Sequence, residues 1–213
     1  MAAPRFAYLH GFASSALSKK GLFLAGVLRG QGLVLERPDL NRPSFAELSH
    51  DAALEAISEM DRAGDEGRWR FIGSSFGGWL AARWAELHPD RVERMMLLCP
   101  GFDLGSRWPT ILGAQKMAEW ERQGFTEFPD GAGVATQVHH GYFLEAQRQP
   151  PWPRVPCPTR ILHGRADVVV PIESSRRYVA EHPHVSLVEL DDDHTLMGSL
   201  GPITDEVLAF LVD

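Results

Sequence analysis

The chain has 213 residues, of which 44% are hydrophobic and 23% charged, and its formal net charge is −7. This composition is typical of an ordinary globular protein, and the length suffices for a single domain, residues 1–213, with a sizeable core. The negative charge, without any Lys- or Arg-rich block, argues against nucleic acid as a partner, and no apolar run is long enough to span a membrane.

The N-terminal segment and the cysteines indicate the location and the redox state of the protein. Residues 1–6 lead directly into a predicted strand and carry neither the apolar core nor the cleavage site of a secretory signal. The only cysteines are Cys99 and Cys157, each bordering a predicted strand, where a buried free thiol is expected. We therefore expect a cytoplasmic protein without disulfides.

Predicted strands and helices alternate along the chain. Short apolar strands are expected at residues 6–9, 33–36, 68–72, 95–99, 159–163 and 185–190. Segments with helical spacing of apolar residues follow at 20–31, 45–63, 76–88, 172–182 and 202–212. The alternation predicts the α/β class, with a mostly parallel sheet of about six strands and helices on both faces.

Residues 101–154 break this alternation. The segment is rich in aromatic residues and holds helical pieces rather than an obvious strand. An insertion that leaves the carboxyl edge of a parallel sheet would cover that edge. We therefore predict a short helical lid here, whose aromatic side chains partly fill its own core and partly face a pocket.

Ser75 is the central candidate. The sequence G-S-S-F-G at residues 73–77 places it between Gly73 and Gly77, after a predicted strand and before a predicted helix. Such a turn forces one residue into a strained conformation and exposes its hydroxyl, while the glycines let the two segments pass closely. Ser74 lacks glycines at the same spacing, so Ser75 is the predicted nucleophile.

A serine hydroxyl needs a base, and the base needs an orienting carboxylate. In a parallel sheet these groups must lie on loops at the carboxyl ends of strands. Asp167 follows the predicted strand 159–163, and His194 follows the strand that ends at Leu190. An oxyanion also needs donors placed in advance, and the backbone N–H groups of Phe12 and Phe76 are the candidates.

The motifs together resemble a small member of the α/β-hydrolase superfamily. They are H-G-F at 10–12, G-S-S-F-G at 73–77, H-G-R-A-D-V-V-V-P at 163–171 and D-H-T at 193–195. The segments around the second and third motifs resemble the mitochondrial acyl-protein thioesterase and acyl-glucuronide esterase branch. The start Y-L-H-G-F-A-S-S resembles small bacterial esterases of the YqiA type. Larger members begin with two extra strands, so a truncated sheet edge is expected here.

The resemblance implies that Ser75 is the nucleophile, Asp167 the acid and His194 the base, with the oxyanion held by Phe12 and Phe76. The expected activity is hydrolysis of carboxylic esters or thioesters of small or acyl-chain substrates, without a metal or cofactor. The residues expected to line the substrate pocket are His10, Gly11, Trp108 and Phe143.

Alternatives remain open at this stage. The same fold could act on an amide, a lactone or a carbon–carbon bond, or could be a catalytically silent binding module.

His10 is a rival base, although bracing its own loop is the simpler role, and His163 is interpreted as a structural residue at a strand end. Asp191, Asp192 and Asp193 are rival carboxylates but are interpreted as a solvated turn. The pair His139-His140 lacks a third ligand at a suitable spacing for a metal.

Overall fold

The computed structural model describes residues 2–212 and is built around one parallel sheet of six strands. Their order across the sheet is β2 (Leu35–Glu36), β1 (Arg5–Leu9), β3 (Trp69–Ser74), β4 (Val92–Leu98), β7 (Thr159–Gly164) and β8 (Val185–Leu190). Every pairing between neighbours is parallel. The predicted sheet is confirmed, and β3 and β4, whose residues are mostly buried, occupy its centre.

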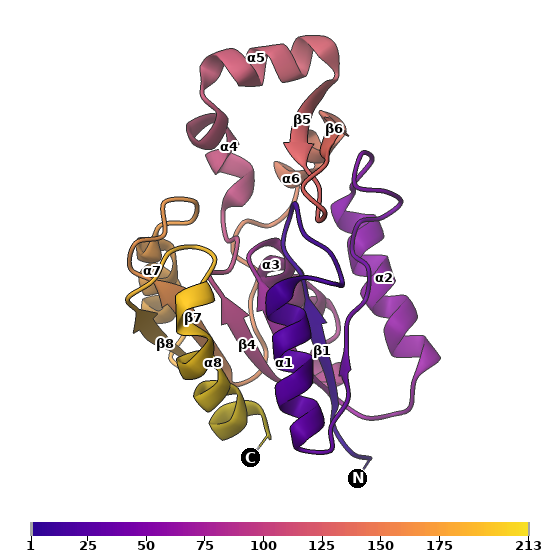
Figure 1. Ribbon diagram of the computed structural model, residues 1–213, viewed down its shortest axis with the longest axis vertical. Helices are drawn as coiled ribbons and strands as arrows, with labels where there is room; N and C mark the ends of the chain where they lie inside the picture. The colour runs from indigo at the N-terminus through magenta and orange to yellow at the C-terminus, as the bar shows by residue number, and fades with distance from the viewer. Residues whose placement is uncertain (1, 213) are drawn as a thin grey trace.

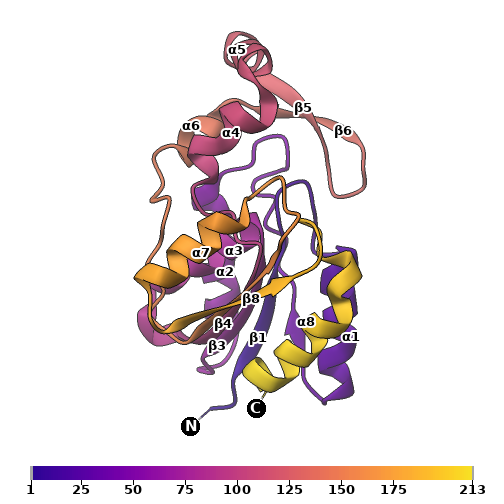
Figure 2. The same cartoon turned by 90° about the vertical axis from the view of Figure 1, so that its left-hand side faces the viewer.

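Helices cover both faces of the sheet (Figures 1 and 2). One face packs against α2 (His50–Ala63), α3 (Phe76–Leu87) and α7 (Ile172–Glu181), and the other against α1 (Lys19–Gly30) and α8 (Leu200–Val207). Short helical turns follow α3 at Pro89–Arg91 and precede α8 at Met197–Ser199, and a π-helical turn at Leu208–Val212 follows α8. Each face therefore has its own apolar core, separated by the sheet.

Serine caps fix where two helices begin. The side chain of Ser18 accepts a hydrogen bond from the N–H of Gly21 at the start of α1, and Ser49 accepts one from Ala52 at the start of α2. The helix expected over 45–63 therefore begins only at His50, because its cap is Ser49. The predicted strand at 33–36 is likewise shorter, and only Leu35–Glu36 pairs with β1.

The lid lies above the end of the sheet to which the strands point (Figure 1). It consists of α4 (Leu104–Leu112), α5 (Ala114–Gln123), β5 (Phe125–Pro129), β6 (Ala135–His139) and α6 (Gly141–Ala146). The expectation of helical pieces alone is wrong for residues 125–139, where β5 and β6 form an antiparallel hairpin. Asp130 closes its turn by accepting hydrogen bonds from the N–H groups of Ala132 and Val134.

The thiols and the helices agree with the sequence in the described part of the chain. Cys99 and Cys157 are both free and buried, as predicted. Among residues 2–212, no helix is both long and apolar enough to cross a membrane.

Candidate active site

Ser75 lies at the sharp turn from β3 into α3. Its backbone has φ 53° and ψ −117°, a positive φ that is uncommon for a residue with a side chain. The flanking glycines allow the turn. A Cβ built on Gly77 would lie 2.1 Å from the carbonyl oxygen of Leu9, and one on Gly73 would lie 2.5 Å from that of Gly77. Both glycines are therefore required by packing, and Ser75 is held at the carboxyl edge of the sheet.

His194 and Asp167 meet Ser75 at this edge. The Nε2 atom of His194 lies 3.0 Å from the Ser75 hydroxyl oxygen, and its Nδ1 atom lies 2.6 Å from Oδ2 of Asp167. Asp167 comes from the loop after β7 and His194 from the loop after β8. The structure thus brings together three side chains that are far apart in sequence, in the order hydroxyl, imidazole and carboxylate.

Asp167 fixes the tautomer of this imidazole. Its Oδ1 accepts hydrogen bonds of 2.8 Å from the N–H groups of Val169 and Val170, so Oδ2 is the oxygen that faces His194. A carboxylate can only accept, so Nδ1 of His194 carries the proton and Nε2 is free to accept one from Ser75. Burial alone would raise the pKa of Asp167, but hydrogen bonds from His163 and His194 outweigh it and hold this pKa well below its usual range.

His163 is a second histidine on the same carboxylate. Its Nε2 lies 3.2 Å from Oδ2 of Asp167 and 2.8 Å from the carbonyl oxygen of Val170, and its Nδ1 lies 2.7 Å from the hydroxyl of Ser175. The ring is fully buried at the end of β7. The interpretation as a structural strand-end residue therefore misses its contact with Asp167. The H-x-x-x-D spacing of residues 163–167 was the only signal in the sequence.

The predicted oxyanion donors lie beside Ser75. Phe76 is the first residue of α3, and the first N–H groups of a helix have no partner within the helix. Gly11 precedes Phe12, and a Cβ built on Gly11 would lie 3.3 Å from the Cβ of Ser75. The backbone around both predicted donors therefore passes close to the serine.

The rival residues have other partners. The Nδ1 atom of His10 lies 2.9 Å from the carbonyl oxygen of Gly11, and its Nε2 accepts a hydrogen bond from the N–H of Leu40. Burial lowers the pKa of this imidazole, which favours its neutral form. The two contacts hold the ring in its loop. Asp193 accepts two hydrogen bonds from Thr195, within a turn, rather than facing the ring of His194.

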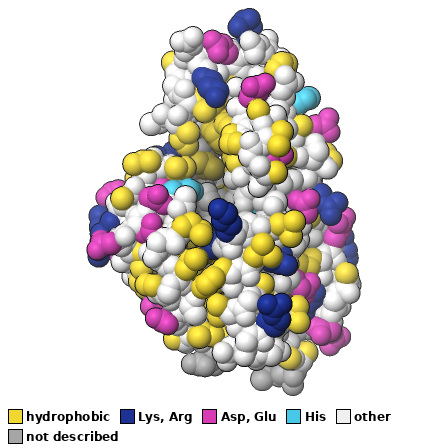
Figure 3. Space-filling view, in the orientation of Figure 1, with side chains coloured by type: hydrophobic (Ala, Val, Ile, Leu, Met, Phe, Trp, Pro, Cys, Tyr) yellow, Lys and Arg dark blue, Asp and Glu magenta, His cyan; other side chains and the backbone are white. Residues whose placement is uncertain are grey.

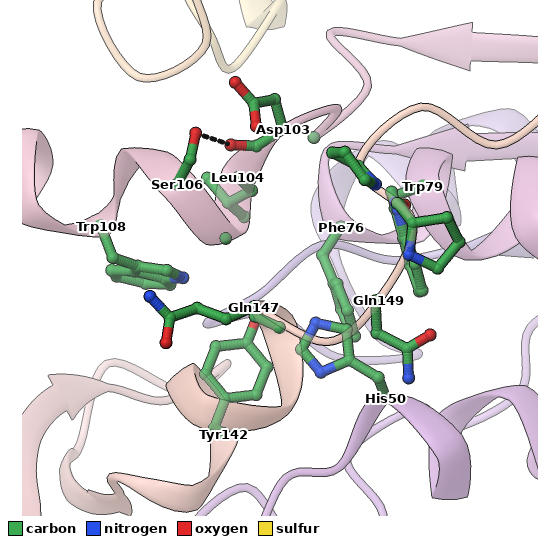
Figure 4. Close-up of a pocket in the computed structure, with 15 residues that line it drawn as sticks. His50, Phe76, Trp79, Asp103, Leu104, Ser106, Trp108, Tyr142, Gln147 and Gln149 are labelled. Carbon is green, nitrogen blue, oxygen red and sulfur yellow. Dashed lines mark hydrogen bonds between the residues drawn. The ribbon is translucent and has the colours of Figure 1, made fainter.

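A cavity of about 230 Å³ lies between the lid and α3. Its lining includes Phe76, the residue after Ser75, and Gly101, whose N–H donates to the carbonyl oxygen of Ser75. Its other walls come from α2, α4 and α6 (Figure 4). Figure 3 shows hydrophobic side chains gathered where the lid meets the body of the protein. The cavity is therefore next to the backbone of the candidate nucleophile, although the side chains of Ser75, Asp167 and His194 are not among its lining.

The four residues predicted to line the substrate pocket are placed differently from one another. Trp108 lines the cavity. Phe143 does not, because its ring packs inside the lid against His140 and Trp120, with ring centres 5.4 and 6.1 Å apart. His10 and Gly11 lie on the loop beside Ser75 and not in this cavity.

Three further aromatic or imidazole rings line the cavity, of which only Tyr142 belongs to the lid aromatics expected partly to face a pocket. His50, Trp79 and Tyr142 all line it, from α2, α3 and α6. Trp79 is held by a hydrogen bond of 2.9 Å from its indole N–H to the carbonyl oxygen of Pro150. Nothing in the local sequence of His50 distinguishes it from any other first residue of a capped helix.

Glu145 fastens the lid to the body. From α6, its Oε1 accepts hydrogen bonds from the hydroxyl of Ser49 at 3.0 Å and from the N–H of Asp51 at 2.8 Å. These donors lie at the N-terminus of α2, where a negative charge is stabilised by the helix dipole. Burial alone would raise the pKa of Glu145, but the neighbouring His50 imidazole and the Asp51 N–H outweigh it and lower this pKa to about 2.

Replacing Glu145 by glutamine should therefore make stability less dependent on pH. A carboxyl whose folded pKa is lowered stabilises the fold above its unfolded pKa, here 4.5, and this stabilisation is lost as the pH falls towards about 2. At pH 7 the variant should lose about 1 kcal/mol, or roughly 2–4 °C in Tm, and the difference should shrink below pH 4.5. The measurement is Tm against pH, with Glu121→Gln on the exposed face of α5 as the matched control. A constant difference between pH 2 and pH 7 would contradict the assignment.

Comparison with known proteins gives a family and a fold. The sequence profile of the Uncharacterised protein family (UPF0227) matches residues 5–211. No protein in a search of curated proteins matches the chain.

Solved structures match over nearly the whole chain. Alpha/beta hydrolase domain-containing protein 10 from mouse is 20% identical with a TM-score of 0.82, covering 99% of this chain and 90% of its own. Est1E from Butyrivibrio proteoclasticus is 20% identical with a TM-score of 0.79, covering 99% and 87%. A pyrethroid hydrolase from Sphingobium faniae JZ-2 is 17% identical with a TM-score of 0.67, covering both chains completely. These likenesses confirm the predicted α/β-hydrolase fold.

Proposed function

Because the chain belongs to the UPF0227 family and has the α/β-hydrolase fold, we propose that it is a serine hydrolase that cleaves carboxylic esters or thioesters. One observation carries the proposal. His194 lies within hydrogen-bond distance of both Ser75 and Asp167, and the second oxygen of Asp167 is occupied by two backbone N–H groups. This is the geometry that activates a serine hydroxyl.

In the first half of the reaction, the Ser75 hydroxyl oxygen attacks the acyl carbon while Nε2 of His194 takes its proton. The negative charge on the carbonyl oxygen is stabilised by the N–H groups of Phe12 and Phe76, and Asp167 stabilises the imidazolium. When the bond to the leaving group breaks, His194 donates its proton to the departing oxygen or sulfur. The acyl group remains on Ser75.

In the second half, His194 takes a proton from water, and the resulting hydroxide attacks the acyl carbon. The proton then returns to Ser75 as the acid leaves. His194 is well placed for this exchange because its side chain is 20% exposed, whereas that of Asp167 is fully buried. Water can thus reach the base while the carboxylate stays protected.

The proposed function is tested by treating the wild-type protein with a fluorophosphonate probe and by assaying p-nitrophenyl esters. We expect one equivalent of label on the peptide that contains Ser75, with loss of ester hydrolysis in proportion to labelling. The physical reason is that only an activated serine attacks the probe. A folded protein that neither reacts nor hydrolyses any ester would instead be a silent binding module.

A further inference from the structure

Three polar side chains with no hydrogen-bond partner among residues 2–212 line the cavity beside Ser75. They are the Trp108 indole, the Tyr142 hydroxyl and the His50 imidazole at Nδ1. Their residues are only 4%, 2% and 5% exposed. Buried polar groups in proteins are almost always paired, so an unpaired group costs about 1–3 kcal/mol. Three of them around one cavity indicate a site that a ligand would complete.

The three groups come from different parts of the chain but face the same space. Figure 4 shows the indole nitrogen of Trp108 on the ring edge that faces Gln147, and the ring of Tyr142 directed towards the same residue. The rings of His50 and Tyr142 are stacked, with centres 4.8 Å apart and planes at 20°. The nearest carboxylate oxygen to Nδ1 of His50 belongs to Glu145 and lies 3.9 Å away, beyond hydrogen-bond distance.

The other buried tryptophans and Tyr178 have hydrogen-bond partners, and the remaining unpaired buried side-chain atoms among residues 2–212 belong to Arg37, Arg83, Arg107 and Asp192, which do not line the cavity. The indole N–H groups of Trp69, Trp79, Trp84 and Trp120 all donate within the protein. The hydroxyl of Tyr178 donates to the carbonyl oxygen of Pro153. Pairing is thus the rule for such groups in this chain, and Trp108 and Tyr142 depart from it where they meet the cavity.

The chemistry of the lining defines what would fit. An indole N–H only donates and a phenol O–H donates readily, so these groups call for an oxygen acceptor. No Lys or Arg lines the cavity, whereas Asp103 does and Glu145 lies near His50, so a negatively charged group would be repelled. The walls are flat rings, with Phe76 parallel to Trp79. The cavity therefore suits a flat group that carries an uncharged oxygen.

We propose that the cavity is an acyl-binding subsite for esters whose acyl group is flat, such as an aromatic ring, and bears an uncharged hydroxyl or ether oxygen that Trp108 and Tyr142 bind. The inference rests on the proposed function, because the acyl carbon must reach Ser75. It goes further by naming a substrate class. Plain alkyl chains would leave the buried donors unpaired and should be poorer substrates.

The test compares two esters of equal shape, p-nitrophenyl 3-(4-hydroxyphenyl)propanoate and its 4-methylphenyl analogue. For the wild type, kcat/KM should favour the hydroxyl ester by about 10- to 30-fold. Trp108→Phe and Tyr142→Phe should each reduce this preference about fivefold, chiefly through the hydroxyl ester. Tyr178→Phe is the matched control and should leave the preference unchanged, because its hydroxyl donates to the carbonyl oxygen of Pro153 and Tyr178 does not line the cavity.

Stability separates binding from a structural role. Tyr142→Phe should not lower Tm, because the hydroxyl it removes has no protein partner, whereas Tyr178→Phe should lower it by removing a buried hydrogen bond. A fall in Tm for Tyr142→Phe equal to that for Tyr178→Phe, with the ester preference intact, would overturn the subsite.

A binding assay keeps the subsite distinguishable from the catalytic proposal. Tryptophan fluorescence of the Ser75→Ala protein should show tighter binding of 3-(4-hydroxyphenyl)propanamide than of the 4-methyl amide. That preference without any hydrolysis by the wild type would support the subsite and reject the hydrolase function. Equal hydrolysis of the two esters, with equal binding of the two amides, would overturn the subsite and leave the hydrolase function standing.

Discussion

Replacing Ser75 by alanine should lower kcat for ester hydrolysis by about 10⁴-fold or more. In the proposed mechanism, the change removes the oxygen that attacks the acyl carbon and the group that His194 deprotonates. The fold should survive, because alanine keeps the Cβ and the backbone hydrogen bonds of residue 75 are made by its main chain. Initial rates with p-nitrophenyl acetate, normalised to folded protein, provide the measurement.

Ser74→Ala is the matched control for this experiment. The two serines are neighbours in the same motif, but the Ser74 hydroxyl accepts a hydrogen bond from Lys20 Nζ and is buried. Its loss should affect stability and leave kcat within a few-fold of the wild type. Near-normal hydrolysis by Ser75→Ala, or an equal loss in both variants, would remove Ser75 from the reaction.

The second large effect is expected for Asp167→Asn, which should lower kcat by roughly 10³- to 10⁴-fold. Oδ1 of Asp167 accepts from the N–H groups of Val169 and Val170, so the amide oxygen of the variant must occupy that position. The NH₂ group is then directed at Nδ1 of His194. A donor there forces Nδ1 to accept, which moves the imidazole proton to Nε2, so the ring can no longer take the proton of Ser75.

Asp193→Asn is the control for the carboxylate, since Asp193 adjoins His194 in sequence and is exposed. Its side chain accepts from Thr195 rather than from the imidazole, so kcat should change only a few-fold. Full kinetics of both variants between pH 6 and 9 provide the comparison. A larger loss for Asp193→Asn than for Asp167→Asn would show that Asp193, and not Asp167, orients the imidazole of His194.

Much of the fold was predictable because its signals are local. The central strands β3 and β4 contain the apolar runs Phe71–Ile72 and Met95–Leu98, and the glycines around Ser75 mark a turn that few other residues allow. Parallel strands also bring the ends of distant segments to one edge, which is why the sequence predicts that Ser75, Asp167 and His194 lie together.

The lid and its cavity were less predictable because they depend on tertiary contacts. The hairpin β5–β6 is half-exposed, so selection for burial does not impose a clear alternation of apolar and polar residues on its sequence. The pattern that identifies a strand is therefore missing there. Phe143 and Tyr142 are adjacent aromatics on a short helix, and only their orientation decides that one packs inside the lid and the other lines the cavity. His50 reaches the cavity from α2, far away in sequence.

The positive φ of Ser75 also bears on how this chain can evolve. A residue held in such a conformation costs on the order of 1–3 kcal/mol, and glycine would adopt the same backbone with little strain. Selection for heat resistance alone would favour glycine at this position. If Ser75 is the nucleophile, as we propose, a serine at this position lowers thermal stability in exchange for reactivity. Screens that reward only survival at high temperature would then be expected to enrich for inactive variants of this chain.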